Sequence, residues 1–277
     1  MKPENEVLKD FYLLADYLEK KHKIKDSNKY KNNLSAFLLH ANHIKSYDFV
    51  APFCKDKRVL DIGCFIGYGE SRIFSQAKEI IAIDSDDDAI NFARNRSIPG
   101  VKFEKAEATS LPFLDDTFDI IIAFQLIEHI PPDEVETFLC QVRKILKKKG
   151  LLFITTPNRK FRLMPFQRPF NSEHYQEFTA KGLLRVLEKN FGNVQIKGIR
   201  AKKWIEEIER RRVRKSPLIK IKKHFEKIYS NIVNKKGNGE FNRLFQQFSM
   251  DDFYLEDQNL DKSMVLFAIC EKNRYTE

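Results

Sequence analysis

Apolar residues along this chain follow two alternating patterns, short unbroken runs and longer stretches in which they recur every three or four positions. The unbroken runs predict buried strands, at residues 58–62, 80–84, 101–105, 119–124, 151–155, 193–199 and 263–271. The spaced stretches predict amphipathic helices, at residues 4–22, about 30–50, 69–76, 86–96, 133–147 and 178–190. Strands that are apolar on both faces and alternate with helices are typical of a mostly parallel sheet covered on each side. The pattern therefore predicts the α/β fold class.

The first two predicted strands enclose a turn that contains several glycines. Gly63, Gly67 and Gly69 follow the strand at 58–62, and glycine lets the backbone approach a ligand closely because it has no Cβ atom. The second strand ends at Asp84, 21 residues after Gly63, where a carboxylate can accept hydrogen bonds from both hydroxyls of a ribose. This order of strand, turn, helix, strand and acid indicates half of a nucleotide-binding fold. Its glycine spacing is not that of the dinucleotide fingerprint.

The turn itself carries a family resemblance. Its spacing, Asp61-x-Gly63-x-x-x-Gly67-x-Gly69, resembles the first motif of the class I methyltransferases that depend on S-adenosylmethionine (SAM), usually Asp-x-Gly-Cys-Gly-x-Gly. The resemblance implies a Rossmann-like, seven-stranded, mostly parallel sheet and SAM as the cofactor. In that family the loop formed here by Gly63, Cys64 and Gly67 wraps the methionine part of SAM. The acid corresponding to Asp61 helps to hold the ammonium group.

Further cofactor residues follow from the same resemblance. The segment 105–113 resembles Gly-Asp-Ala-x-x-Leu-Pro-Phe, so Glu107 would accept a hydrogen bond from the adenine amino group, with Ala108 beside it. Asp84 would bind the ribose, and Gln125 ends the fourth strand, which lies beside the methyl group in the family. Phe65 departs from the motif because it stands where the middle glycine is usual. If that position needs a positive φ, a bulky residue there costs about 1–2 kcal/mol.

Four other segments resemble motifs on the acceptor side of one methyltransferase branch. They are His43-x-x-x-Tyr47, Gln125-x-x-Glu128-His129, Thr156-Pro-Asn-Arg159 and Asn171-x-x-His174-x-x-Glu177-Phe-Thr179. This branch is often found with bacterial surface-polysaccharide enzymes. The resemblance therefore implies O-methylation of a sugar hydroxyl in a glycan or a lipid-linked glycan. A small aromatic or quinone-like acceptor, RNA 2′-O-methylation and a degenerate SAM-binding interaction protein are the alternatives.

Glu128, His129 and His174 are the candidate catalytic residues, and three roles remain open for them. A histidine can act as the general base for an acceptor hydroxyl, since its pKa is matched to neutral pH. The three residues can instead bind a divalent metal that lowers the pKa of that hydroxyl. The segment Gln125-x-x-Glu128-His129 is similar to a Glu-x-x-Glu-His motif. Gln125 weakens the metal hypothesis, because it stands where that motif has its first glutamate and carries no charge to neutralise the metal. In the third interpretation, His129 is structural.

The charge of the chain is concentrated in one segment. The net charge is +10, and residues 197–240 hold 15 Lys and Arg against 5 Asp and Glu, so this segment accounts for the whole excess. It is predicted to be mostly helical, with a basic amphipathic helix beginning near Pro217. Such a helix can bind an anionic membrane or a phosphorylated polymer through residues 201–236, or cover the substrate cleft. The neutral remainder disfavours nucleic acid as the partner.

The cysteines and the N-terminal residues indicate the cellular compartment. Four scattered cysteines favour a reducing compartment, and the first residues lack the apolar stretch of a signal peptide. We therefore expect a cytoplasmic protein, peripheral at the membrane if the basic helix binds there. The predicted organisation is a helical N-terminal cover at 1–54, a SAM-binding core at 55–200, a basic helical insertion at 201–250 and a C-terminal strand region at 251–277.

Overall fold

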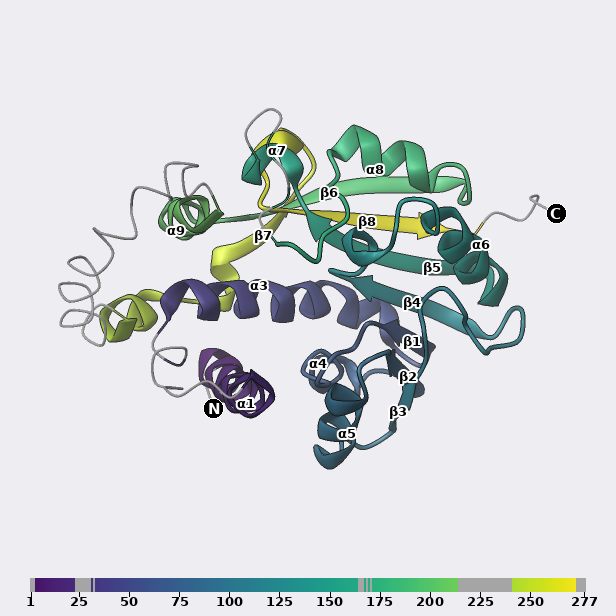
Figure 1. The fold of residues 1–277 in the computed structure, drawn as a ribbon, viewed down its shortest axis with the longest axis horizontal. Helices are drawn as coiled ribbons and strands as arrows, with labels where there is room; N and C mark the ends of the chain where they lie inside the picture. Colours follow the sequence, from purple (N-terminus) through teal and green to yellow (C-terminus); the bar gives the residue numbers. More distant parts are fainter. Residues whose placement is uncertain are drawn as a thin grey trace. The chain divides into compact units, whose positions relative to one another are not determined.

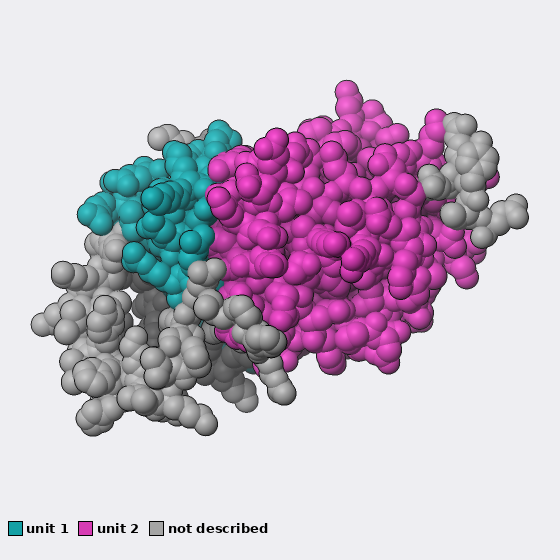
Figure 2. Space-filling view, turned by 90° about the horizontal axis from the view of Figure 1, so that it is seen from above, with its two compact units in different colours: residues 1–42, 201–253 teal, residues 43–200, 254–277 magenta. Residues whose placement is uncertain are grey.

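The computed structural model describes residues 3–22, 31, 33–163, 167, 169, 171–213 and 241–272. The chain forms two compact units, one of residues 1–42 and 201–253 and one of residues 43–200 and 254–277, coloured separately in Figure 2. The predicted basic amphipathic helix, from Pro217 onward, lies outside the described residues. None of the helices that the structure describes is long and apolar enough to cross a membrane.

A single mixed sheet of eight strands organises the larger unit (Figure 1). The strands are β1 (Arg58–Ile62), β2 (Glu79–Asp84), β3 (Val101–Lys105), β4 (Phe118–Phe124), β5 (Leu146–Pro157), β6 (Asn193–Ala201), β7 (Phe253–Glu256) and β8 (Val265–Glu271). Their order is β3-β2-β1-β4-β5-β8-β6-β7. The first five are parallel, and β8 is antiparallel to both β5 and β6. The fold is thus the predicted mixed α/β, Rossmann-like arrangement.

The number of strands corrects the sequence analysis, which predicted seven. The additional strand is β7, whose four residues, Phe-Tyr-Leu-Glu, are too short a run to give a strand signal. Strand β5 also begins at Leu146, five residues before the predicted start, because a polar Lys-Lys-Lys segment is included in it. In both places, backbone pairing with a neighbouring strand defines the strand, and an apolar run does not.

The helices fall close to their predicted places, except for α7, which was not predicted. They are α1 (Pro3–His22), α3 (Leu34–Val50), α4 (Glu70–Ile73), α5 (Asp87–Asn95), α6 (Val135–Ile145), α7 (Arg159–Arg162), α8 (Ala180–Leu187) and α9 (Lys203–Val213). Short 3₁₀ turns are η1 (Ala51–Cys54), η2 (Ile127–His129), η3 (Met250–Asp252) and η4 (Leu260–Lys262). Figure 1 shows α5 beside β2 and β3, and α6 beside β5.

The two faces of the sheet are covered by different side chains, because successive residues of a strand point to opposite faces. Leu152 and Ile154 of β5 belong to a buried cluster with Phe138 of α6 and Leu183 of α8. Phe153, between them, instead contacts Phe53 of η1, with ring centroids 5.2 Å apart. The sheet is therefore buried on both sides, as its apolar runs predicted.

The smaller unit is built around aromatic side chains of α1, the first part of α3 and the segment from 241. Phe37 is fully buried, and its ring lies 5.6 Å from Phe11, 5.4 Å from Phe245 and 5.2 Å from Phe248. Helix α9, which carries the beginning of the basic segment, also belongs to this unit. The limits of the predicted domains stay a prediction.

Candidate active site

The glycine turn after β1 is held against the end of β2 by backbone hydrogen bonds. The amides of Gly63 and Cys64 both donate to the carbonyl oxygen of Ile83, at 2.8 and 3.0 Å. Gly67 has φ +73°, and a Cβ atom there would lie 2.8 Å from the ring of Phe103. Glycine is therefore required at Gly67 by conformation and by packing together.

Phe65 adopts a left-handed backbone conformation, with φ of 51°. The structure confirms that this position, which holds a glycine in the family motif, needs a positive φ. The Phe65 amide donates a 2.8 Å hydrogen bond to Oδ2 of Asp84. This bond offsets part of the cost of the strained conformation.

Asp84 links the two parallel strands through its carboxylate. Oδ2 accepts from Phe65, and Oδ1 accepts a 3.0 Å hydrogen bond from the amide of Asp86. A carboxylate oxygen has two lone pairs, so each oxygen can still accept one bond from a ligand. Asp86 caps α5 by accepting from the amides of Asp88 and Ala89.

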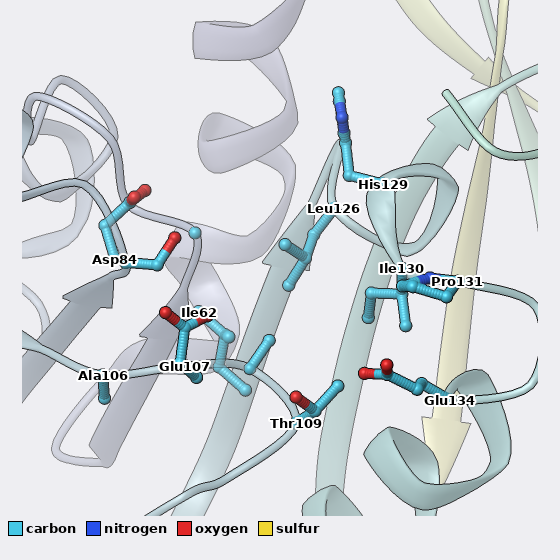
Figure 3. A pocket seen from close by; sticks show the side chains of 13 residues that line it. Ile62, Asp84, Ala106, Glu107, Thr109, Leu126, His129, Ile130, Pro131 and Glu134 are labelled. Atoms are coloured by element: carbon cyan, nitrogen blue, oxygen red, sulfur yellow. The ribbon is translucent and has the colours of Figure 1, made fainter. Parts of the chain in front are cut away.

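A cavity of about 220 Å³ opens beside these residues. It is lined by Ile62, Gly63, Asp84, Ser85, Ala106, Glu107, Ala108, Thr109, Leu126, His129, Ile130, Pro131 and Glu134. Figure 3 shows Asp84 and Glu107 on one side of the cavity and His129, Ile130 and Glu134 on the other. Five residues proposed from the sequence are thus brought together, namely Gly63, Asp84, Glu107, Ala108 and His129.

Several residues predicted from the sequence do not line this cavity. They are Asp61, Cys64, Gly67, Gln125, Glu128 and His174. Gln125 has φ of 52°, and its side-chain amide donates to Oγ1 of Thr155 at 3.1 Å. Its side chain therefore connects the end of β4 to β5. Leu126 and Glu134 are lining residues that sequence reasoning missed, because no motif distinguishes them from their neighbours.

A pair of buried carboxyl groups lies below the glycine turn. Asp61 is fully buried, and burial is the main reason that its pKa rises to about 7, with hydrogen bonding to Tyr47 and Glu70 opposing the rise. Glu70, at the start of α4, is also fully buried, and burial and the charge of Asp61 raise its pKa. A cationic ligand would favour the ionised form of both groups. Their chemistry fits the ammonium group of SAM, and the sequence analysis missed Glu70.

The acceptor residues come from two segments that the fold brings together. Glu128 and His129 lie in η2, after β4, and His174 lies in the loop before α8. One ligand atom from each lies within 4.8 Å of those from the other two. The rings of His129 and His174 are 4.7 Å apart and nearly perpendicular, at 86°. These residues could hold a metal ion, or share a proton.

Glu128 and His129 differ in their surroundings. Glu128 is fully buried, its Oε2 accepts a 2.9 Å bond from Oγ1 of Thr156, and burial raises the pKa of its carboxyl to about 8. Burial, and then the neighbouring His174, lower the pKa of His129. The imidazole of His129 is therefore favoured in its neutral form, with a lone pair available.

Glu177 supports the cluster, although the sequence analysis noted it only as part of a motif. Its Oε1 lies 3.3 Å from Nδ1 of His174 and 3.7 Å from Nε of Arg162, and all three side chains are buried or nearly so. A carboxylate can only accept a hydrogen bond, so Nδ1 of His174 is the nitrogen that donates to Glu177.

Asn158, from the Thr-Pro-Asn-Arg segment, has a structural role. It is fully buried, and its Nδ2 donates to the carbonyl oxygens of Leu260 and Ser263, both at 2.7 Å. The next amide, Arg159, donates to the carbonyl oxygen of Phe178 at 2.9 Å. The Asn158 side chain therefore ties the end of β5 to the turn before β8, and the Arg159 amide ties it to the segment after His174.

Comparisons with known proteins agree with this geometry. A family described as a methyltransferase domain matches residues 33–195. A probable S-adenosylmethionine-dependent methyltransferase of Mycobacterium tuberculosis H37Rv is 33% identical over 158 residues, 57% of each protein. A fatty-acid O-methyltransferase of Mycolicibacterium smegmatis is 30% identical over 142 residues, 48% of this chain and 51% of that protein. The chain thus spans little more than half the length of the curated relatives it matches.

Solved structures show the same fold. The YcgJ protein of Bacillus subtilis superposes with a TM-score of 0.52 and 18% sequence identity, covering 83% of this chain and 98% of that one. At this identity the likeness concerns the fold alone.

Proposed function

The chain belongs to the methyltransferase domain family, with SAM as its cofactor, and we propose that it transfers the SAM methyl group to a hydroxyl oxygen. One observation carries the proposal. The cavity that begins at Asp84 and Glu107 reaches His129, and His129 lies against His174 and near Glu128. The residues assigned to the nucleoside therefore line the same cavity as His129, one of the candidate proton acceptors.

We assign the cofactor residues by chemistry. Asp84 would accept bonds from the ribose hydroxyls, and Glu107 would accept one from the adenine amino group. Gly63 has φ of +81°, and a Cβ atom there would lie 3.3 Å from Leu126, so glycine lets the turn that would hold the methionine part pass close to this lining residue. Asp61 and Glu70 would stabilise the ammonium group by charge.

The reaction needs an acceptor that loses a proton. When bound, SAM supplies a methyl group on a sulfonium sulfur; a new O–C bond forms, the S–C bond breaks, and its electron pair stays on sulfur. The hydroxyl proton must leave the acceptor, and we assign its removal to Glu128, His129 and His174, whose polar atoms lie close together. Much of the remaining rate comes from placing the two reactants in line.

We propose a sugar hydroxyl, in a glycan or a lipid-linked glycan, as the acceptor. The acceptor side of the cavity carries the polar side chains of Thr109, Glu134 and His129. Tyr175, next to His174, is 62% exposed, and an exposed aromatic ring can pack against the apolar face of a sugar. These features support an acceptor with several hydroxyl groups.

An apolar acceptor with an oxygen nucleophile is the second candidate. One relative is named as a fatty-acid O-methyltransferase, and Leu126 and Ile130 give the cavity an apolar wall. The two candidates differ in the products they predict, so one screen separates them.

The screen uses purified protein, labelled SAM and four acceptor sets: nucleotide sugars, lipid-linked sugars, fatty acids and RNA. We expect label in a sugar fraction, lost in Asp84→Ala with every acceptor. Label in fatty acids alone would replace the sugar proposal, and label in no fraction, with no SAM binding, would refute the methyltransferase proposal.

The basic segment at 201–236 is proposed to bring the enzyme to an anionic membrane or a phosphorylated polymer. Of this segment the structure describes 201–213, and helix α9 there carries Arg210, Arg211 and Arg212 in its last turn. Cosedimentation with vesicles, with and without anionic lipid, tests the idea on the full chain. Binding should need anionic lipid and should fall as salt rises, whereas binding equal to neutral vesicles would refute it.

A further inference from the structure

We propose that Glu128, His129 and His174 form a binding site for a divalent cation of the zinc type. The inference concerns how the acceptor proton is handled, and it rests on the proposed function only for the role of the ion. Binding of the ion itself does not depend on methyl transfer.

The three side chains form a ligand set suited to a metal ion. Two imidazoles and one carboxylate offer one ligand atom each, all within 4.8 Å of one another. Ligand atoms around a tetrahedral zinc ion lie roughly 3.4 Å apart, given bonds of about 2.0–2.1 Å. Side-chain rotations that move each atom by about an ångström would close the site. A mixed set of nitrogen and oxygen favours Zn²⁺ over Mg²⁺, which prefers oxygen.

The carboxyl group of Glu128 is already held with one oxygen available to a metal ion. Its Oε2 is occupied by Thr156, whereas its Oε1 is buried and has no hydrogen-bond partner in the part of the chain that the structure describes. A buried carboxylate oxygen without a partner is unfavourable. A cation at that position would give it one.

His174 has the carboxylate partner that is common for a metal-binding histidine. Histidines that bind metals commonly donate their other ring nitrogen to a carboxylate, which fixes the ring and makes the free nitrogen a better ligand. Nδ1 of His174 meets Glu177 in this way at 3.3 Å, and Arg162 holds the same oxygen from the other side at 3.7 Å. Glu177 is therefore assigned as a positioning residue for the ligand His174.

Three protein ligands leave at least one coordination position open, as in catalytic zinc sites. An acceptor hydroxyl bound there would lose its proton more readily, because the cation stabilises the alkoxide. Gln125, which stands where the similar motif has a glutamate, is not one of the proposed ligands, and its side-chain amide donates to Oγ1 of Thr155.

The test uses metal-stripped full-length protein and the ions alone, without SAM or acceptor. Calorimetry with Zn²⁺ should show one equivalent bound, more tightly than Mg²⁺, and Co²⁺ should give the visible absorption bands of a bound ion. His174→Asn and Glu128→Gln should lose both signals. Glu177→Gln should keep them with about 10- to 100-fold weaker binding.

Glu188→Gln is the matched control, because Glu188 is exposed at the end of α8 and offers no atom to the cluster. It should bind as the wild type does. Saturable binding that persists in His174→Asn would place the ion elsewhere and refute the site. No binding of any ion by a protein that binds SAM would also refute it, while leaving the proposed methyl transfer intact.

Discussion

The cofactor half of the site takes its shape from backbone that is local in sequence, whereas side chains from distant segments form the acceptor half. Phe65 and Asp84, on the cofactor side, are 19 residues apart and joined by a backbone amide. On the acceptor side, Glu128 meets Thr156 across 28 residues, and His129 meets His174 from another loop. The first half can be found from a motif, and the second needs the tertiary fold.

The largest expected effect is that of Asp61→Asn on the free energy of unfolding. This substitution of a buried carboxyl should change stability and SAM binding in opposite directions. The pKa of Asp61 is about 7 when folded and about 3.9 when unfolded. The folded state therefore holds this proton more tightly, and the stability that it contributes is lost as pH rises from about 4 through 7. Asp61→Asn cannot titrate, so above pH 7 the free variant should be more stable than the wild type, by at most about 4 kcal/mol.

Thermal unfolding of both proteins without SAM, at several pH values, measures this difference. The gap should be small near pH 4 and should widen up to pH 8, while SAM binding is lost in the variant. Asp87→Asn, whose side chain is mostly exposed, should show no such trend. A gap that does not change with pH would mean that Asp61 is already ionised in the free protein.

Asp84→Ala should have the next largest effect, and it removes both functions of the carboxylate. The variant loses the ribose contacts and also leaves the amide of Phe65 without its acceptor. Hydrogen bonds to charged groups contribute about 1.5–3 kcal/mol, so SAM should bind about 100-fold more weakly. Calorimetry measures this, with Asp87→Ala as the control. If SAM bound equally to both variants, the cofactor assignment would be wrong.

The contrast between the local cofactor half and the non-local acceptor half also explains which features could be predicted from the sequence. Strands β1, β2 and β4 follow from apolar runs, and Gly67 and Asp84 follow from spacing, since their neighbours in space are near in sequence. Strand β7 was missed because pairing, not hydrophobicity, defines it. Glu70 and the support that Glu177 gives to His174 could not be predicted, since burial and partner geometry alone give these acids their importance.

Asn158→Ala tests whether the acceptor half depends on remote packing. The substitution removes two buried hydrogen bonds to Leu260 and Ser263 and should cost about 2 kcal/mol of unfolding free energy. Since the amide of the next residue, Arg159, holds the carbonyl oxygen of Phe178, four residues after His174, methyl transfer should fall while SAM affinity is unchanged. Asn171→Ala, at an exposed turn, is the control for stability. A parallel loss of SAM affinity would show that the two halves are not independent.

The smallest expected effect concerns Phe65, and comparing two substitutions isolates it. Phe65→Ala and Phe65→Gly both remove the ring, but only glycine adopts φ of 51° without strain. The glycine variant should therefore be more stable than the alanine variant by about 1 kcal/mol, as measured by denaturant unfolding. At an ordinary φ the order would reverse, because glycine loses more entropy on folding. A more stable alanine variant would thus show that the turn relaxes, and that the backbone of the cofactor half is less fixed than its hydrogen bonds indicate.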